Sequence, residues 1–102
     1  MPLVTAAGHR LHYERIGRST LGRPTLVFLH EGLGSVSTWR DFPARAVRAT
    51  GCESVVYSRW GYGKSDRLVG ARGVGYMHDE GLEALPGLLD ALEVKQPILV
   101  GH

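Results

Sequence analysis

Three short apolar runs constrain the fold of this chain more than any other feature of its sequence. They are TLVFL at 25–29, SVVY at 54–57 and PILV at 97–100. They lack the apolar–polar alternation of strands that face water on one side, so they predict strands buried on both faces of a parallel sheet. Helical patterns separate the runs. This order of strand, helix, strand, helix and strand predicts an α/β fold with a mostly parallel sheet.

Two extended segments precede the first buried run. The segments 3–5 and 10–16 flank Gly8, a suitable turn residue, and together they predict an opening β-hairpin. The polar stretch 17–24, which contains two glycines and a proline, then predicts a loop that leads into the first buried strand.

The first helix is predicted after the run 25–29. Ser35, Ser37 or Thr38 can cap it, and Gly51 is suited to end it. Pro43 lies inside this segment and predicts either a kink or a short first turn ahead of the main helix.

The second helix is predicted to begin at Tyr76, after an irregular glycine-rich stretch. Asp79 and Glu80 lie near its N-terminal end, where negative charge is favourable. Pro86 predicts a bend or an early boundary. The apolar stripe expected to face the sheet consists of Met77, Leu82, Leu85, Leu88, Leu89 and Leu92.

Composition excludes several function classes. The chain has 102 residues, 43% of them hydrophobic, which suits one small domain. Its 12 basic and 10 acidic residues are scattered, so we expect no nucleic-acid partner. The apolar runs are far shorter than the roughly 20 residues that span a membrane, and no signal-peptide pattern opens the chain. The single cysteine, Cys52, excludes an internal disulfide, fits a cytoplasmic protein and is expected to be a small core residue.

The buried runs end in turns that contain glycine. These turns are His30-Glu31-Gly32-Leu33-Gly34, the stretch 58–65, and Gly101-His102. In open α/β sheets, binding sites gather beyond the carboxyl ends of the strands. A turn such as HEGLG can expose unpaired N–H groups at the entrance of a helix, where developing negative charge is stabilised.

These motifs, in this order, resemble the α/β-hydrolase family along essentially the whole chain. The stretch from His30 to Ser35 is similar to the family's H-G-x-x-x-S turn, and SRWGYGKS at 58–65 is similar to its D-x-R-G-x-G-x-S loop. The run PILVGH resembles the approach to the nucleophile elbow, G-x-S-x-G, with Gly101 and His102 at its start.

The resemblance implies a function and a set of site residues. The backbone N–H of Gly32, with that of Leu33 second, becomes the candidate for the oxyanion hole. His30, Glu31 and Trp39 become candidates for the substrate pocket. The substrate class implied is a small carboxylic ester or lactone, cleaved through a nucleophile–His–acid triad without a cofactor or metal. Dehalogenases and epoxide hydrolases in the family use Asp as nucleophile, so Ser and Asp both stay open.

The chain departs from the family pattern at several positions. Glu31 replaces the usual glycine and is expected to point away from the reacting centre, since a carboxylate there would oppose an oxyanion. Ser58 and Trp60 replace the usual Asp and Arg. In family order the nucleophile, acid and base follow His102, so residues 1–102 are expected to be an incomplete hydrolase domain, inactive alone and prone to self-association.

A triad within these 102 residues would have to use Ser35 or Ser65 with one of the histidines. Ser35 is expected to cap a helix and Ser65 to hold its own loop, so no such triad is expected. His9 and His12 are expected to be surface residues of the hairpin.

Two alternatives from other classes stay open. Gly63-Lys64-Ser65 resembles the end of a nucleotide-binding loop, although no helix is predicted directly after it and Ser58 stands where that pattern begins with glycine. The chain can also be a non-catalytic binding module that retains the hydrolase scaffold.

Overall fold

A five-stranded mixed sheet organises the chain. The computed structural model describes residues 2–18 and 22–102, so part of the loop expected at 17–24 lies outside the described residues. The spatial order of the strands is β1-β2-β4-β3-β5. Their bounds are Leu3–Ala6 for β1, His9–Ile16 for β2, Thr25–Leu29 for β3, Ser54–Tyr57 for β4 and Pro97–Gly101 for β5.

The opening hairpin is antiparallel, and the three later strands are parallel to one another. β1 pairs with β2 and β2 pairs with β4 in antiparallel register, whereas β3 lies parallel to both β4 and β5. Ala7 and Gly8 form the hairpin turn, and both have positive φ, 51° and 82°. A two-residue turn of this kind matches the right-handed twist of the strands that it joins. The predicted α/β fold, with a hairpin and then parallel strands, is confirmed.

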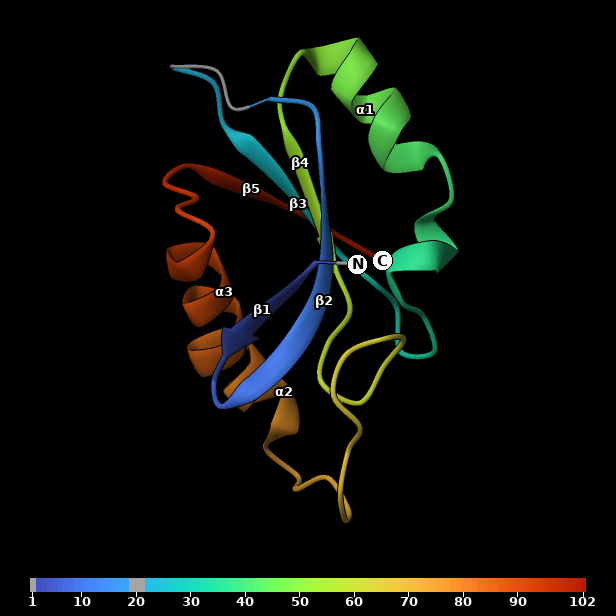
Figure 1. The fold of residues 1–102 in the computed structure, drawn as a ribbon, viewed down its shortest axis with the longest axis vertical. Coiled ribbons are helices and arrows are strands. Elements are labelled where there is room, and N and C mark those ends of the chain that lie inside the picture. Colours follow the sequence, from blue (N-terminus) through green and yellow to red (C-terminus); the bar gives the residue numbers. More distant parts are fainter. Residues whose placement is uncertain (1, 19–21) are drawn as a thin grey trace.

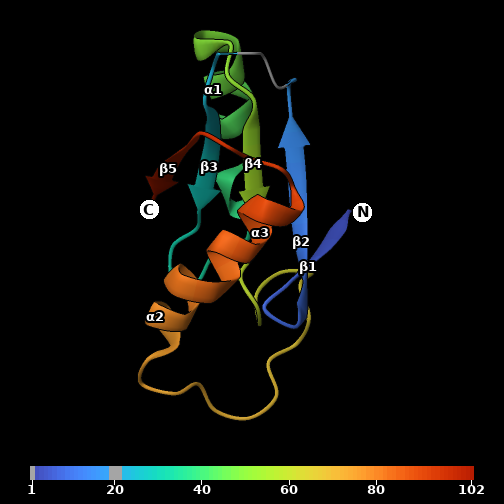
Figure 2. The same cartoon turned by 90° about the vertical axis from the view of Figure 1, so that its left-hand side faces the viewer.

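Helices cover both faces of the sheet (Figure 1). On one face lie a 3-10 turn, η1 (Val36–Trp39), and α1 (Phe42–Thr50). On the other lie α2 (Tyr76–Asp79), the π-helical segment η2 (Glu80–Ala84) and α3 (Leu85–Ala91). Figure 2 shows α3 crossing in front of the sheet.

The central strands alternate between two cores. Val27 and Val55 face α3 and pack in a cluster with Leu88. Phe28 and Val56 face the opposite side and pack with Cys52 and other residues near α1. Because both faces are covered, β3 and β4 need no polar positions, which explains their uninterrupted apolar runs. Cys52 is a buried free thiol, as predicted.

The first predicted helix consists of two pieces. Ser35 precedes η1, Arg40 then adopts a positive φ of 53°, and α1 begins with Pro43 in its first turn. Proline is tolerated there because the first helical N–H groups have no intrahelical partner. Gly51 ends α1 in the left-handed conformation, with φ 73°. Of the two outcomes expected from Pro43, the short first turn is the one observed.

The second predicted helix contains a π-helical segment that ends at Ala84, and α3 begins at Leu85, so the boundary expected at Pro86 is observed. The N–H of Leu85 donates to the carbonyl of Glu80, five residues back. Pro86 follows directly and has no N–H to continue the α-helical ladder, which favours a widened turn at this point. The extra residue changes the angular register, so the predicted apolar stripe is wrong at Met77 and Leu82, which are 52% and 75% exposed.

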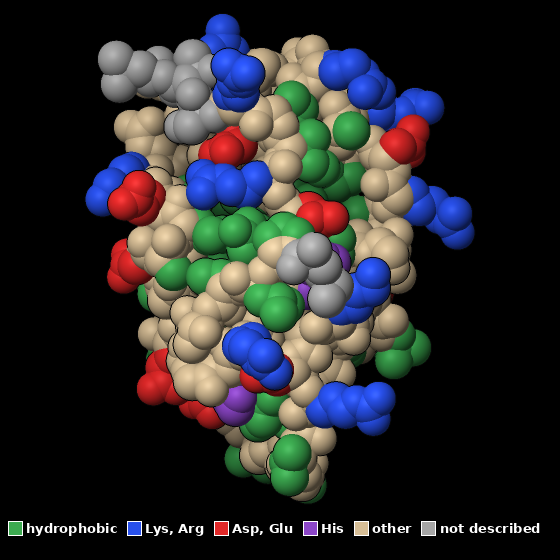
Figure 3. Space-filling model, in the orientation of Figure 1, with side chains coloured by type: hydrophobic (Ala, Val, Ile, Leu, Met, Phe, Trp, Pro, Cys, Tyr) green, Lys and Arg blue, Asp and Glu red, His purple; other side chains and the backbone are tan. Residues whose placement is uncertain are grey.

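β5 differs from the other parallel strands in its exposure. It pairs only with β3 and lies at the edge of the sheet. Ile98 and Leu99 are 47% and 50% exposed, so the predicted burial of this run on both faces is wrong for the described structure. No helix of the described residues is long and apolar enough to cross a membrane. Basic and acidic side chains are interspersed on the face seen in Figure 3.

Candidate functional site

The three strand ends singled out in the sequence meet at one edge of the sheet. The parallel register places Gly101 beside Leu29, the last residue of β3. The backbone N–H of His102 donates to the carbonyl of Leu29 at 3.2 Å. The same register places Tyr57, the last residue of β4, beside Leu29 on its other side. The turn 30–34, the loop 58–65 and the segment Gly101-His102 are therefore neighbours.

Residues 31–34 form a tight turn after β3. The N–H of Gly34 donates to the carbonyl of Glu31 at 3.0 Å and closes the turn. Gly32 and Leu33 lie at its tip, and the Leu33 side chain is 96% exposed. No described residue accepts a hydrogen bond from the N–H of either. Two donors without partners are thus presented at the carboxyl edge of the sheet, where an anionic group can be bound.

His30 lies directly under this turn and is buried, with 3% of its surface exposed. Its Nδ1 lies 2.7 Å from the carbonyl oxygen of Glu31, and its Nε2 accepts the backbone N–H of Arg59 at 3.0 Å. Burial lowers the pKa of His30 below its ordinary value, and the nearby charge of Arg59 acts in the same direction. His30 is therefore a neutral residue that joins the turn to the loop after β4.

Arg59 is the residue that the sequence analysis missed. It is 8% exposed, and its Nη1 donates to the carbonyl of His30 at 2.8 Å. Its guanidinium lies 4.9 Å from the ring centre of Tyr62. The Nε atom is buried without a hydrogen-bond partner among the described residues. Only one signal in the sequence marks it, an arginine two residues beyond a buried strand, and the family pattern treats that position as variable.

The Glu31 side chain is engaged with η1. Its Oε1 lies 3.5 Å from Oγ1 of Thr38, a hydroxyl that donates more closely to the carbonyl of Ser35, at 2.8 Å. A Cβ atom at Gly34 would collide with the same carboxylate, so a larger residue there would require the Glu31 side chain to move. The carboxylate that replaces the family's glycine thus lies beside the helical turn that follows.

Trp39 packs mainly as a core residue. It is half-buried, and its ring meets Phe28 edge-on at 5.0 Å and stacks on Phe42 at 6.1 Å. It also lies 6.2 Å from the ring of His102, which links it to the end of β5. Its indole nitrogen is buried without a described partner. Trp39 therefore lies between the core and the strand edge.

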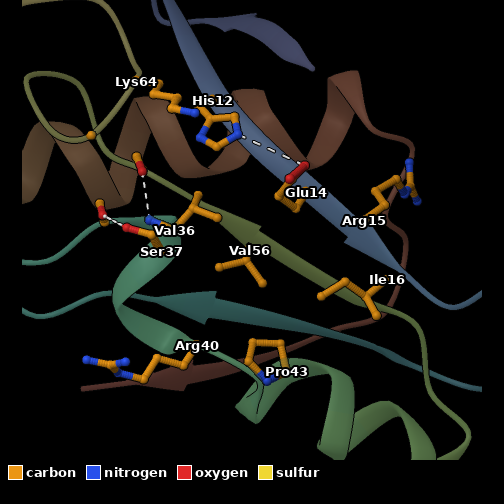
Figure 4. Close-up of a pocket in the computed structure, with 13 residues that line it drawn as sticks. His12, Glu14, Arg15, Ile16, Val36, Ser37, Arg40, Pro43, Val56 and Lys64 are labelled. Atoms are coloured by element: carbon orange, nitrogen blue, oxygen red, sulfur yellow. Dashed lines mark hydrogen bonds and ion pairs between the residues drawn. The ribbon is translucent and has the colours of Figure 1, made fainter. Parts of the chain in front are cut away.

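A groove with a volume of about 470 Å³ lies on the α1 side of the sheet (Figure 4). Figure 4 shows Val56 between the polar side chains of β2 and the side chains of Arg40 and Pro43. None of the seven site residues predicted from the sequence lines it. His12, expected on the surface, is 8% exposed and lies 4.0 Å from Glu14. It is buried because the loop 58–65 covers β2.

The loop 58–65 is held by its serines. Ser65 Oγ donates to the carbonyl of Ser58 at 2.6 Å and accepts the backbone N–H of His12 at 2.8 Å. Ser58 Oγ accepts the N–H of Val36 at 2.9 Å and so ties the loop to η1. The predicted role of Ser65 in its own loop matches these contacts.

The geometry of Gly63-Lys64-Ser65 disfavours nucleotide binding. In a phosphate-binding loop a helix begins at once, and its first N–H groups meet the phosphate. Here α2 begins only at Tyr76, and the Ser65 hydroxyl is used within the loop.

Trp60 lies apart from the turn. Its ring stacks on His9 at 3.8 Å, and it lines a cavity of about 200 Å³ near the hairpin turn. Arg72 lies over the same ring at 5.9 Å and donates to the Trp60 carbonyl at 2.6 Å. Trp60, which replaces the family's arginine, therefore anchors the loop against the hairpin.

Comparison with known proteins identifies the fold. No family model and no curated protein matches the sequence. Among solved structures, an epoxide hydrolase from Vigna radiata covers 99% of this chain with a TM-score of 0.80 and 27% identity. An N-acyl homoserine lactone degrading enzyme covers 98% with a TM-score of 0.70 and 25% identity. The enol-lactonase from Burkholderia xenovorans LB400 covers 98% with a TM-score of 0.77 and 22% identity.

The chain covers 30%, 35% and 36% of these three structures, about a third of their length. The hairpin, the parallel strands and the covering helices all fall within the matched region. By its architecture and the order of its motifs, this chain has the α/β-hydrolase fold, of which it forms the N-terminal part.

Proposed function

We propose that these residues belong to a hydrolase that cleaves a small carboxylic ester or lactone. The observation that carries the proposal is the pair of N–H groups at Gly32 and Leu33. No described residue accepts a hydrogen bond from either of them. They lie at the carboxyl edge of the sheet, in a fold shared with an enol-lactonase, an N-acyl homoserine lactone degrading enzyme and an epoxide hydrolase.

In the proposed reaction, a nucleophilic oxygen attacks the carbonyl carbon of the substrate, and the nucleophile's proton passes to a histidine base. The carbonyl oxygen becomes negatively charged, and the Gly32 N–H donates to it. The leaving oxygen then takes the proton from the histidine, and water hydrolyses the covalent intermediate. The nucleophile, base and acid would come from residues that follow His102 in a longer chain.

The codons after His102, together with the intact mass of the native protein, test the first part of this proposal. Continuation as Ser-x-Gly supports a serine hydrolase, and Asp at that position shifts the chemistry to epoxide or halide substrates. A stop codon with a native mass of 11.1 kDa overturns it and leaves the non-catalytic module. The 102-residue chain is expected to show no turnover, and turnover abolished by Ser35→Ala or Ser65→Ala would contradict the proposal.

A matched pair of variants of the intact hydrolase tests the role of Gly32. Proline at this position removes the N–H. Gly32 is the second residue of the turn, and proline is favoured at the second position of such turns. Alanine keeps the N–H, and no atom lies within 4 Å of the Cβ that it adds. We expect Gly32→Pro to lower kcat for ester hydrolysis by about 10²–10³-fold and Gly32→Ala to change it little. Equal kcat values for the two variants would refute the role.

A further inference from the structure

We propose that His30 and Arg59 are positioning residues that fix the peptide between Glu31 and Gly32, so that the Gly32 N–H faces outward from the turn. The three contacts that do this are called the turn clamp: Arg59 N–H to His30 Nε2, His30 Nδ1 to the Glu31 carbonyl, and Arg59 Nη1 to the His30 carbonyl. The inference rests on the proposed function, because it assigns a use to the Gly32 N–H.

The first step concerns the proton on His30. A backbone N–H can only donate, so the 3.0 Å contact from Arg59 requires a lone pair on Nε2. A neutral imidazole then carries its proton on Nδ1. That proton is donated to the carbonyl oxygen of Glu31 at 2.7 Å. The backbone of the loop 58–65 thus selects the His30 tautomer that holds the turn 31–34.

The second step concerns the direction of the Gly32 N–H. The Glu31 carbonyl accepts from His30 Nδ1 and from the N–H of Gly34, so it points into the turn. In a planar trans peptide the C=O and the following N–H point in opposite directions. The Gly32 N–H therefore points out of the turn, away from the imidazole. Rotation of this peptide would break two hydrogen bonds at once.

The third step concerns the charge of Arg59. Its Nη1 fixes the preceding carbonyl, that of His30, at 2.8 Å. No described carboxylate forms an ion pair with this buried guanidinium, and its Nε has no described partner. A buried charge without a counter-ion is costly. Beside a turn that must stabilise a negative charge, however, its positive potential favours that charge.

The groups that face His30 are few. Glu31 lies on its own turn, and Arg59 and Tyr62 lie on the loop after β4, with the Tyr62 ring 4.9 Å from the imidazole. Protonation of Nε2 would place an N–H against the N–H of Arg59 and a positive charge beside its guanidinium. The clamp therefore requires the neutral imidazole.

Nuclear magnetic resonance of the ¹⁵N-labelled 102-residue chain tests the clamp directly. Long-range ¹H–¹⁵N correlations are expected to place the His30 proton on Nδ1. The backbone order parameter of the Gly32 N–H is expected to be about 0.85, the value of a rigid backbone. Neither measurement uses catalytic activity.

Variants separate the contacts of the clamp. His30→Asn places a donor near the position of Nδ1, and His30→Gln places an acceptor near that of Nε2. We expect the Gly32 order parameter to stay high in His30→Asn and to fall below about 0.6 in His30→Gln and Arg59→Met. Arg59→Lys, which restores a cationic donor, is expected to recover it at least partly. Arg67→Met changes an exposed arginine two residues beyond the loop 58–65 and is the matched control.

A His30 proton on Nε2 in the unmodified chain would overturn the clamp, even where every variant fails to fold. So would a Gly32 N–H that stays rigid in both His30→Gln and Arg59→Met. The proposed function is tested separately. If the Gly32 N–H is rigid and clamped but Gly32→Pro leaves kcat of the intact hydrolase unchanged, the oxyanion role is refuted and the clamp is not. A mobile Gly32 N–H with a large loss in Gly32→Pro refutes the clamp alone.

Discussion

Arg15 binds the carboxylate of Glu53 through two parallel hydrogen bonds, from Nε and from Nη2, each 2.9 Å long. Its third nitrogen, Nη1, donates to the carbonyl of Leu92 at 2.8 Å. Arg15 lies on β2, Glu53 directly precedes β4, and Leu92 follows α3. One guanidinium therefore joins the hairpin, the parallel strands and the helix that covers them.

Removal of this guanidinium is expected to destabilise the fold. Glu53 is 6% exposed, so Arg15→Met leaves a buried carboxylate without its counter-ion. Breaking a buried pair costs about 3–5 kcal/mol, and because a third of the Arg15 side chain is exposed we expect about 2–3 kcal/mol. The control is Arg45→Ala, which breaks the exposed pair with Asp41 and should cost much less, because solvent screens exposed charges. Urea denaturation measures both, and equal losses would contradict the prediction.

The stability of the chain is expected to fall as the pH falls below 6.5, the ordinary pKa of histidine. Burial lowers the pKa of both His12 and His30 in the folded state. Below pH 6.5 the unfolded chain therefore binds protons that the folded chain does not, and stability is lost until the lowered folded pKa values are passed. Above 6.5 both histidines are neutral in both states, and their contribution is fully present.

Urea midpoints measured from about pH 8 to about pH 5 test this slope. His12→Gln is expected to flatten it, whereas a change at His78, which is exposed, is the control. The hydrogen bonds from Arg10 lower the pKa of Asp66, so the stability that this carboxylate contributes is lost only at pH values below the histidine range. A midpoint that is constant across the range would show that neither histidine is held neutral.

Local sequence patterns predicted the architecture well because both faces of β3 and β4 are covered. Strands in that environment need no alternating polar positions, and their apolar runs are visible without any alignment. The outcome at Pro43 follows from the same kind of local rule, since proline fits the first turn of a helix. Pro86 was harder, because a bend and a π-helical segment both accommodate its missing N–H.

The candidate site was less predictable because its contacts join loops distant in sequence. The burial of His12 depends on a hydrogen bond to Ser65, 53 residues away. The burial of Arg59 depends on the turn at His30, 29 residues away. Pairings between loops so far apart leave no periodic pattern in the sequence. A motif pattern marks the positions that a family shares, and Arg59 occupies one that the pattern leaves free.

Self-association of the 102-residue chain is expected through β5. This strand lies at the sheet edge, with Ile98 and Leu99 about half exposed, and an apolar edge strand is a template for pairing with another chain. Ile98→Lys is expected to reduce association in sedimentation velocity. Val74→Lys changes a fully exposed valine in a loop and should leave association unchanged. A chain that sediments as a monomer at all concentrations would contradict this prediction.

Gly63 is expected to tolerate alanine poorly. Its φ is +50°, and an added Cβ would lie 2.7 Å from Ser58 Oγ and 2.9 Å from Ser35 Cβ. Because Ser58 Oγ also accepts the N–H of Val36, the displacement would weaken the contact between the loop and η1. Gly70→Ala is the matched control, with φ +83° and no atom within 4 Å of the added Cβ.

Both substitutions place a side chain at positive φ, which costs about 1–2 kcal/mol. Only Gly63→Ala adds an overpacking cost, about 1–3 kcal/mol more. Urea midpoints are therefore expected to fall further for Gly63→Ala than for Gly70→Ala. Because η1 directly follows the turn 31–34, the Gly32 amide resonance should also shift in Gly63→Ala and stay in place in Gly70→Ala. Equal midpoints and unchanged Gly32 resonances would mean that the loop yields without moving η1, and that close packing of Gly63 does not support the turn.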